Sequence, residues 1–149
     1  MLPKPKHIAM TGLLCAAFAG LASVAAAHDC SYDGVAGHYG FTSSGSIVSP
    51  AIGPFVAVGQ ATFTRSGTVS GSQVTSFGGI LVTETIEATY TINPDCTGSA
   101  TVSIYHGSTL ARTTNLHIVW DEHQTEARGL FLTPGTAISI AARKMFGDD

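Results

Sequence analysis

Charged side chains are scarce in this sequence of 149 residues: they make up 11% of the chain, less than half of the roughly 25% usual for soluble proteins. Lysine and arginine together number only 7. A nucleic-acid-binding protein needs clustered cations that displace counterions from phosphates, so this class is excluded. A disordered chain is excluded too, because 44% of the residues are hydrophobic and the net charge is only −3.

Several catalytic motifs are also missing. The chain has no G-x-S-x-G nucleophile elbow, no C-x-x-C pair, no H-E-x-x-H and no G-x-x-x-x-G-K phosphate loop. We therefore expect no cofactor, and no metal site of these types. What is abundant is glycine, with 17 residues, together with 18 threonines and 14 serines, so the polarity of the chain lies in hydroxyl groups.

The first 27 residues have the pattern of a secretory signal peptide. Lys4 and Lys6 precede an apolar run over residues 8–24, and three alanines follow at positions 25–27. The alternative is an N-terminal membrane anchor. Cleavage would leave a mature chain of residues 28–149 with 5 cations against 10 acidic residues, hence a net charge of −5. We expect a product in the periplasm or outside the cell, without membrane insertion after cleavage.

Cysteine usage fits this compartment. Cys15 leaves with the predicted signal, and the remaining pair, Cys30 and Cys96, predicts one disulfide; two free thiols are the alternative. Closing a loop of about 65 residues stabilises the fold by roughly 3 to 4.5 kcal/mol in the chain-entropy model. The predicted role of this bond is to fasten the start of the mature chain to a hairpin.

Beyond residue 28 the pattern is that of an all-β protein. Short alternating runs rich in threonine, valine, isoleucine and aromatics are separated by glycine, proline, asparagine and aspartate. The predicted strands cover residues 38–43, 55–64, 68–77, 80–92, 99–105, 110–120, 125–133 and 137–145. Residues 42–46 and 66–72 are polar and are predicted as turn regions.

The connections between these strands are short enough for antiparallel hairpins and too short for parallel crossovers. Eight such strands in one domain, residues 28–149, predict a single antiparallel up-and-down barrel, because closure removes exposed strand edges. A two-sheet sandwich is the alternative. Seven aromatic residues are expected to fill the interior: Tyr39, Phe41, Phe55, Phe63, Tyr90, Trp120 and Phe131.

Four segments together resemble a family of small exported bacterial proteins, mostly uncharacterised. They are GHYGF (residues 37–41), GPFVAVGQATF (53–63), SGTVSGS (66–72) and ATYTINPDCTGSATV (88–102), of which residues 90–98 are the most specific. The resemblance implies a calycin-like barrel similar to that of allene oxide cyclases. It departs from the usual pattern at Thr64-Arg65 and Ala88, and it implies no catalytic residues.

Glu84 is the main candidate for a functional residue. Period-two counting places Ile80, Val82, Glu84, Ile86, Ala88, Tyr90 and Ile92 on one face of their strand. If this face points into the barrel, desolvation is expected to raise the pKa of Glu84 and to make it a general acid or base, or an anchor for a ligand. The alternative is a carboxylate near the strand end that is solvated or paired with an arginine.

Three further residues complete the predicted ligand site. Arg112 lies in an apolar row with Leu110, Thr114, Leu116, Ile118 and Trp120, and either reaches Glu84 or extends to solvent at the rim. Arg128 shares a face with Glu126, with which an exterior ion pair is the simpler expectation. An interior cluster of Glu84, Arg112, Tyr90 and Arg128 would mark a ligand pocket.

Histidines offer a different hypothesis. If His28 is the mature N-terminus, its amine and imidazole together with a second histidine form a copper-binding arrangement. The possible partners are His38, His106, His117 and His123, but none of them has a compact spacing. An incidental N-terminal histidine is therefore the preferred interpretation.

Three functions remain open from the sequence. The first is an exported barrel that binds a small apolar or amphipathic molecule in its lumen without converting it. The second is an isomerase or cyclase similar to allene oxide cyclase, in which Glu84 acts on a bound substrate. The third is a non-catalytic structural or adhesive envelope protein with a solid core and an external partner surface.

Overall fold

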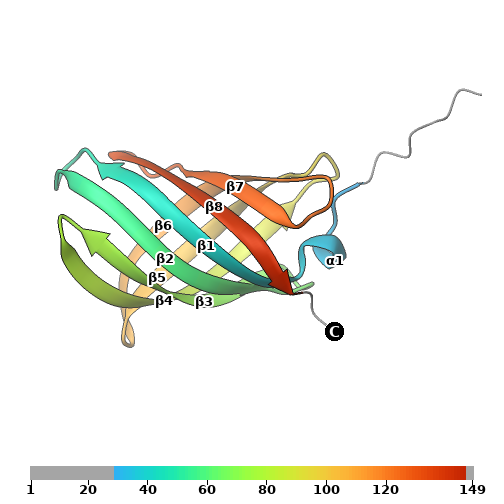
Figure 1. Cartoon of the computed structure of the whole chain (residues 1–149), viewed down its shortest axis with the longest axis horizontal. Coiled ribbons are helices and arrows are strands. Elements are labelled where there is room, and N and C mark those ends of the chain that lie inside the picture. The colour runs from blue at the N-terminus through green and yellow to red at the C-terminus, as the bar shows by residue number, and fades with distance from the viewer. Residues whose placement is uncertain (1–28, 147–149) are drawn as a thin grey trace, which may run out of the picture.

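The barrel predicted from the sequence is present. In the computed structural model, residues 29–146 are described, and eight antiparallel strands in sequence order form one closed barrel (Figure 1). The signal peptide, Cys15 and His28 lie outside the described residues. The elements are α1 (Tyr32–Val35), β1 (Gly37–Ile47), β2 (Gly53–Phe63), β3 (Thr68–Phe77), β4 (Ile80–Ile92), β5 (Thr97–His106), β6 (Thr109–Trp120), β7 (Glu126–Phe131) and β8 (Thr136–Phe146).

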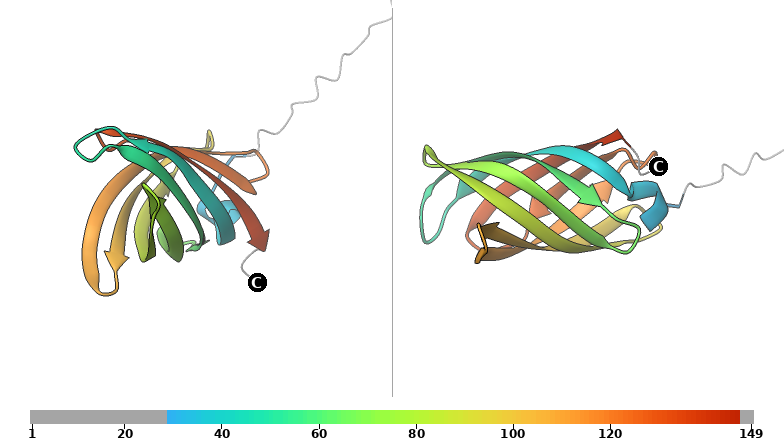
Figure 2. Two further views of the ribbon diagram at one scale, coloured as in Figure 1. Left: turned by 60° about the vertical axis from the view of Figure 1, so that its left-hand side comes forward. Right: turned by 90° about the horizontal axis from the view of Figure 1, so that it is seen from below.

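Closure comes from the pairing of β1 with β8, whose register runs from His38 opposite Phe146 to Ile47 opposite Thr136. Each remaining strand pairs with its neighbours in the sequence, so no strand of the barrel has a free edge. The two ends of the barrel differ. Helix α1 lies at one, the helix end, and the turns at residues 48–52, 78–79, 107–108 and 132–135 lie at the other, the distal end (Figure 2).

Strand β1 is longer than predicted. The sequence places a turn at residues 42–46, whereas the structure continues the strand through them to Ile47. Paired strands on both sides satisfy the backbone of this segment, and that tertiary pairing overrides the turn preference of serine and glycine. Strand β3 has the bounds predicted for it, 68–77, so only the first two residues of the polar region 66–72 precede it. Helix α1 was not expected.

Gly59 allows two inward side chains to pass close to the backbone of β2. A Cβ atom here would lie 2.3 Å from the Ser72 carbonyl oxygen, 2.7 Å from Cζ of Phe41 and 2.8 Å from Cβ of Gln73. Backbone and packed side chains cannot yield by that much without shifting the strands. Glycine at position 59 is therefore part of what places Phe41 and Gln73 in the lumen.

We expect Gly59→Ala to lower the free energy of unfolding by about 1 to 3 kcal/mol through overpacking. Urea unfolding followed by the fluorescence of Trp120, the single tryptophan, measures the change. Gly40→Ala is the matched control in β1, because its Cβ would meet nothing closer than Sδ of Met145 at 3.5 Å. The control should stay within about 0.5 kcal/mol of the unmodified protein. Equal losses in both variants would contradict the steric argument.

Candidate ligand-binding lumen

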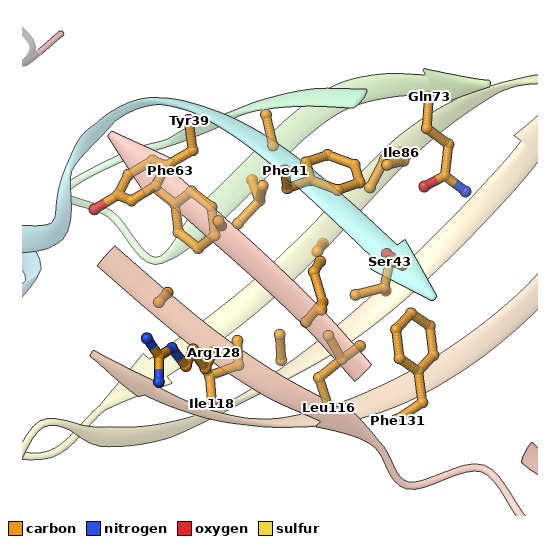
Figure 3. A pocket seen from close by; sticks show the side chains of 18 of the residues that line it. Tyr39, Phe41, Ser43, Phe63, Gln73, Ile86, Leu116, Ile118, Arg128 and Phe131 are labelled. Carbon is orange, nitrogen blue, oxygen red and sulfur yellow. The ribbon is translucent and has the colours of Figure 1, made fainter. Parts of the chain in front are cut away.

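An apolar cavity occupies the middle of the barrel (Figure 3). Its volume is about 80 Å³. The cavity is therefore narrow. Most of its lining is aliphatic or aromatic, and five alanines from five strands leave the space open: Ala61, Ala88, Ala100, Ala127 and Ala142. Its polar lining residues, besides Tyr39, are Ser43, Gln73 and Arg128.

Aromatic rings close the helix end of this lumen. The ring of Phe63 lies 5.0 Å from that of Tyr39, 5.1 Å from that of Tyr90 and 6.4 Å from that of Trp120. The Tyr39 hydroxyl donates to the Val35 carbonyl at 2.9 Å, which ties the cluster to α1. Burial, helped by nearby Tyr90 and Asp121, raises the pKa of the Tyr39 hydroxyl, so this group remains protonated as a donor.

A disulfide and a lysine hold α1 against this end. Cys30 and Cys96 are bonded, with their Cα atoms 4.9 Å apart, so the predicted disulfide is present. It connects the segment before α1 to the turn between β4 and β5. The Lys144 ammonium donates to the Gly34 carbonyl at 2.6 Å. The start of the described chain is thus fastened over one end of the barrel.

A buried polar cluster lies toward the distal end, centred on Glu84. The carboxylate of Glu84 is only 2% exposed and accepts from Arg112 Nη1 at 2.5 Å and from Arg112 Nη2 at 2.8 Å. Thr75 Oγ1 donates to Glu84 Oε2 at 2.7 Å and Gln73 Nε2 to the same oxygen at 2.6 Å. His106 Nε2 lies 2.9 Å from Glu84 Oε1. Both carboxylate oxygens are therefore fully engaged.

This environment reverses the predicted direction of the Glu84 pKa. Burial alone would raise it, but the donors from Arg112, Thr75, Gln73 and His106 together lower the pKa to about 2. A carboxylate that accepts several hydrogen bonds is stabilised in its charged form. At neutral pH Glu84 is an ionised anchor for its neighbours, and it is a poor general acid or base.

Strand order explains how these side chains meet. Glu84, His106 and Arg112 come from the adjacent strands β4, β5 and β6, and Arg112 reaches Glu84 past the intervening β5. The β5–β6 register shifts between Ile104, opposite Arg112, and Tyr105, opposite Leu110. Ala111 is the extra residue of this bulge, and bulges commonly redirect side chains at functional sites. Leu110, expected in the core row, is 52% exposed for the same reason.

Two of the four predicted site residues do not join the cluster. Tyr90 is buried, but it packs at the helix end and its hydroxyl donates to the Thr64 carbonyl at 2.7 Å. Arg128 borders the lumen, yet it is exposed and lies in the outward row of β7 opposite Val119 and Ala141. In the described part of the chain, no ion pair joins it to Glu126, which lies 3.9 Å from Arg143 instead.

Sequence reasoning missed three members of the distal polar region: Ser43, Gln73 and Thr75. All three are buried. Alternation could have found them, since Gln73 and Thr75 share the inward row of β3 with Val69, and Ser43 shares that of β1 with Tyr39 and Phe41. The predicted turn at residues 42–46 concealed the pattern around Ser43, whereas Gln73 and Thr75 lie in the predicted strand 68–77, whose inward row was not examined for polar residues.

The histidines of the copper hypothesis are dispersed. His106 contacts Glu84, and His38 Nδ1 lies 2.9 Å from Thr62 Oγ1. Among residues 29–146, no three histidine, cysteine, aspartate or glutamate side chains gather in a way that could hold a metal ion. His28 itself lies outside the described residues, so the N-terminal arrangement stays a prediction.

Comparisons with known proteins give no relative: no family model, no curated protein and no solved structure matches this chain. Within the described residues, no helix has the length and apolar character that crossing a membrane requires. The class that fold and site define is an eight-stranded antiparallel barrel with a narrow apolar lumen, closed by aromatic rings at one end and bordered by a polar cluster toward the other.

Proposed function

We propose that this protein is an exported carrier that binds one slender apolar or amphipathic molecule in the barrel lumen without converting it. The observation that carries the proposal is the apolar cavity bounded by five alanines. An eight-stranded barrel with small inward side chains has room for one small ligand. The disulfide supports an oxidising, exported compartment, in agreement with the predicted signal peptide.

Conversion of the ligand by Glu84, as in the isomerase hypothesis, has less support. Glu84 points inward, but it does not line the cavity, and both of its oxygens accept hydrogen bonds from the protein. Its pKa of about 2 makes it a weak proton acceptor at neutral pH. The carboxylate is therefore better suited to fix its neighbours than to react.

The structural or adhesive hypothesis rests on a different feature, the apolar side chains of the distal turns. Each of the four turns has at least one exposed aliphatic residue within it or within two residues of it: Val48, Ile52, Ile80, Leu81, Leu110 and Leu132. Exposed apolar groups of this kind favour a contact surface. That hypothesis expects a solid core, however, and the cavity therefore favours lumen binding.

Two neighbouring alanines in β8 provide the test. Ala142 lines the cavity, whereas Ala141 is exposed on the outer face. Titration with diphenylhexatriene, a slender apolar fluorophore, should give saturable one-to-one binding to the unmodified protein. We expect Ala142→Leu to weaken binding by about tenfold or more, because the larger side chain occupies lumen space.

Ala141→Leu adds the same atoms outside the barrel and should leave the affinity unchanged within about twofold. Thermal unfolding of both variants checks that each remains folded. Absence of saturable binding to the unmodified protein, or an equal loss in both variants, would remove the support for a lumen site.

A further inference from the structure

We infer that the lumen selects a neutral ligand with an aliphatic chain and a hydroxyl head group, such as a long-chain alcohol, in preference to a fatty acid. This inference rests on the proposed function and names the ligand class. It comes from two polar atoms that face the cavity, the side-chain oxygens of Gln73 and Ser43 (Figure 3).

The orientation of the Gln73 amide follows from its neighbours. Its Nε2 lies 2.6 Å from Glu84 Oε2 and 3.1 Å from Thr75 Oγ1. A carboxylate only accepts hydrogen bonds, so the atom facing Glu84 has to be the NH₂ group. The Gln73 carbonyl oxygen therefore points the other way, toward the lumen (Figure 3).

Neither lumen-facing oxygen has a protein partner. Ser43 is 2% exposed and Gln73 is 6% exposed. Within residues 29–146, no hydrogen bond reaches the Ser43 hydroxyl, and both bonds of the Gln73 side chain leave through its nitrogen. Both oxygens are open to the cavity, since among residues 29–146 the one fully buried side-chain nitrogen or oxygen without a partner is Nε1 of Trp120. An acceptor and a hydroxyl that border an apolar cavity without a protein partner are the groups that would orient a bound ligand.

The chemistry of these two atoms determines which head group fits. The Gln73 carbonyl can only accept, and the Ser43 hydroxyl can donate or accept. An alcohol has the donor that Gln73 requires and an acceptor for Ser43, so its chemistry matches both.

Charged head groups fit poorly by the same criteria. A carboxylate has no proton to donate to Gln73, and it would be an additional buried anion close to the residues that hold Glu84. Arg112 does not compensate, because its guanidinium is engaged on both oxygens of Glu84. An ammonium group could donate to Gln73, but it would lose its hydration without gaining an anionic partner, since Glu84 is already paired.

The experiment measures displacement of diphenylhexatriene at pH 8 by four ligands with ten-carbon chains: decan-1-ol, 1-methoxydecane, decanoate and decylammonium. We expect decan-1-ol to compete at a concentration about tenfold or more below each of the others. In 1-methoxydecane a methyl group replaces the donor proton, so the part of its deficit that disappears in Gln73→Met reports the hydrogen bond to Gln73.

Gln73→Met should remove the preference without removing the site, bringing decan-1-ol and 1-methoxydecane to within about threefold of one another. Ser43→Ala removes the donor to the ligand oxygen that both molecules share, so it should weaken both and leave their difference in place. Ser44→Ala, one position along β1 on the exposed face, should retain the full preference. Because the ligand series is measured on the unmodified protein, the test does not depend on the folding of any variant.

The outcomes separate this inference from the proposed function. Saturable fluorophore binding with equal competition by all four ligands overturns the head-group inference and leaves the lumen site standing. Tighter binding of decanoate or decylammonium than of decan-1-ol also overturns it. If neither the fluorophore nor any of the four ligands binds, both the proposed function and this inference fail.

Discussion

Replacing Arg112 by methionine is expected to lower the free energy of unfolding by about 3 to 5 kcal/mol at pH 7, because the variant keeps a buried carboxylate without its countercharge. Glu84 is 2% exposed and cannot turn to solvent, whereas the Arg112 side chain is 38% exposed. Urea unfolding of the unmodified and variant proteins measures the loss. The Glu84→Gln/Arg112→Met double variant should recover most of it, since no buried charge remains.

Arg143→Met is the control for loss of a cation. Arg143 and Glu126 are 3.9 Å apart with side chains 82% and 49% exposed, and exposed ion pairs stabilise by at most about 1 kcal/mol. This variant should therefore change stability little. A loss for Arg112→Met no larger than that for Arg143→Met would mean that the Glu84 pair adds nothing to the fold.

The Glu84–Arg112 pair also makes the free energy of unfolding depend on pH in the acidic range. The folded-state pKa of Glu84 is about 2 against its ordinary 4.5, so ionised Glu84 contributes roughly 3 kcal/mol. Because the folded pKa is the lower one, this contribution is fully present above about pH 5 and declines as the pH falls from about 4.5 toward 2. In Arg112→Met the pKa rises, so the difference between the two proteins should shrink in that window. A difference that does not change with pH would contradict this account.

The fold was predictable because it rests on local signals. Alternating residues and short turns specify eight antiparallel strands, and the cost of exposed edges favours closure. Of the seven aromatics predicted to fill the barrel, four are buried members of the core clusters and Phe63 and Phe131 pack against them. The seventh, Tyr39, is fully buried beside Phe63. Local signals did not predict the full length of β1. Residues 42–46 favour a turn, but pairing with β2 and β8 on both sides keeps them in the strand.

The candidate site was predictable only in part, because it depends on register. Alternation places Glu84 and Tyr90 on the same face, but six residues separate them by about 20 Å along a strand, and they lie toward opposite ends of the lumen. Which residues oppose Glu84 depends on strand stagger, which no single strand reveals. Gln73 proves to be its register partner on β3. The pKa prediction failed for the same reason, since the donors that outweigh burial come from neighbouring strands.

Reducing the Cys30–Cys96 disulfide is expected to lower the free energy of unfolding by about 3 to 4.5 kcal/mol, because its removal restores the conformational freedom of the unfolded chain across 66 residues. The measurement is urea unfolding with and without dithiothreitol, each sample being equilibrated from the unfolded state because Cys30 is only 5% exposed. Reduction changes no residue, so the comparison introduces no new side chain at Cys96, whose φ of 66° is in the left-handed region.

Reducing the disulfide should lower the stability of the whole barrel and, in addition, loosen α1 at the helix end. Without the bond, α1 is still held by Lys144 and by the Tyr39 hydroxyl, which donates to the Val35 carbonyl. The strands have their own closed ladder, so we expect the reduced protein to remain folded in water with faster amide exchange in α1 than in β6. The Cys30→Ala/Cys96→Ala variant should match the reduced protein and show no response to dithiothreitol. A loss below about 1 kcal/mol on reduction would mean that the unfolded chain is already constrained between these positions, and the entropic argument would fail.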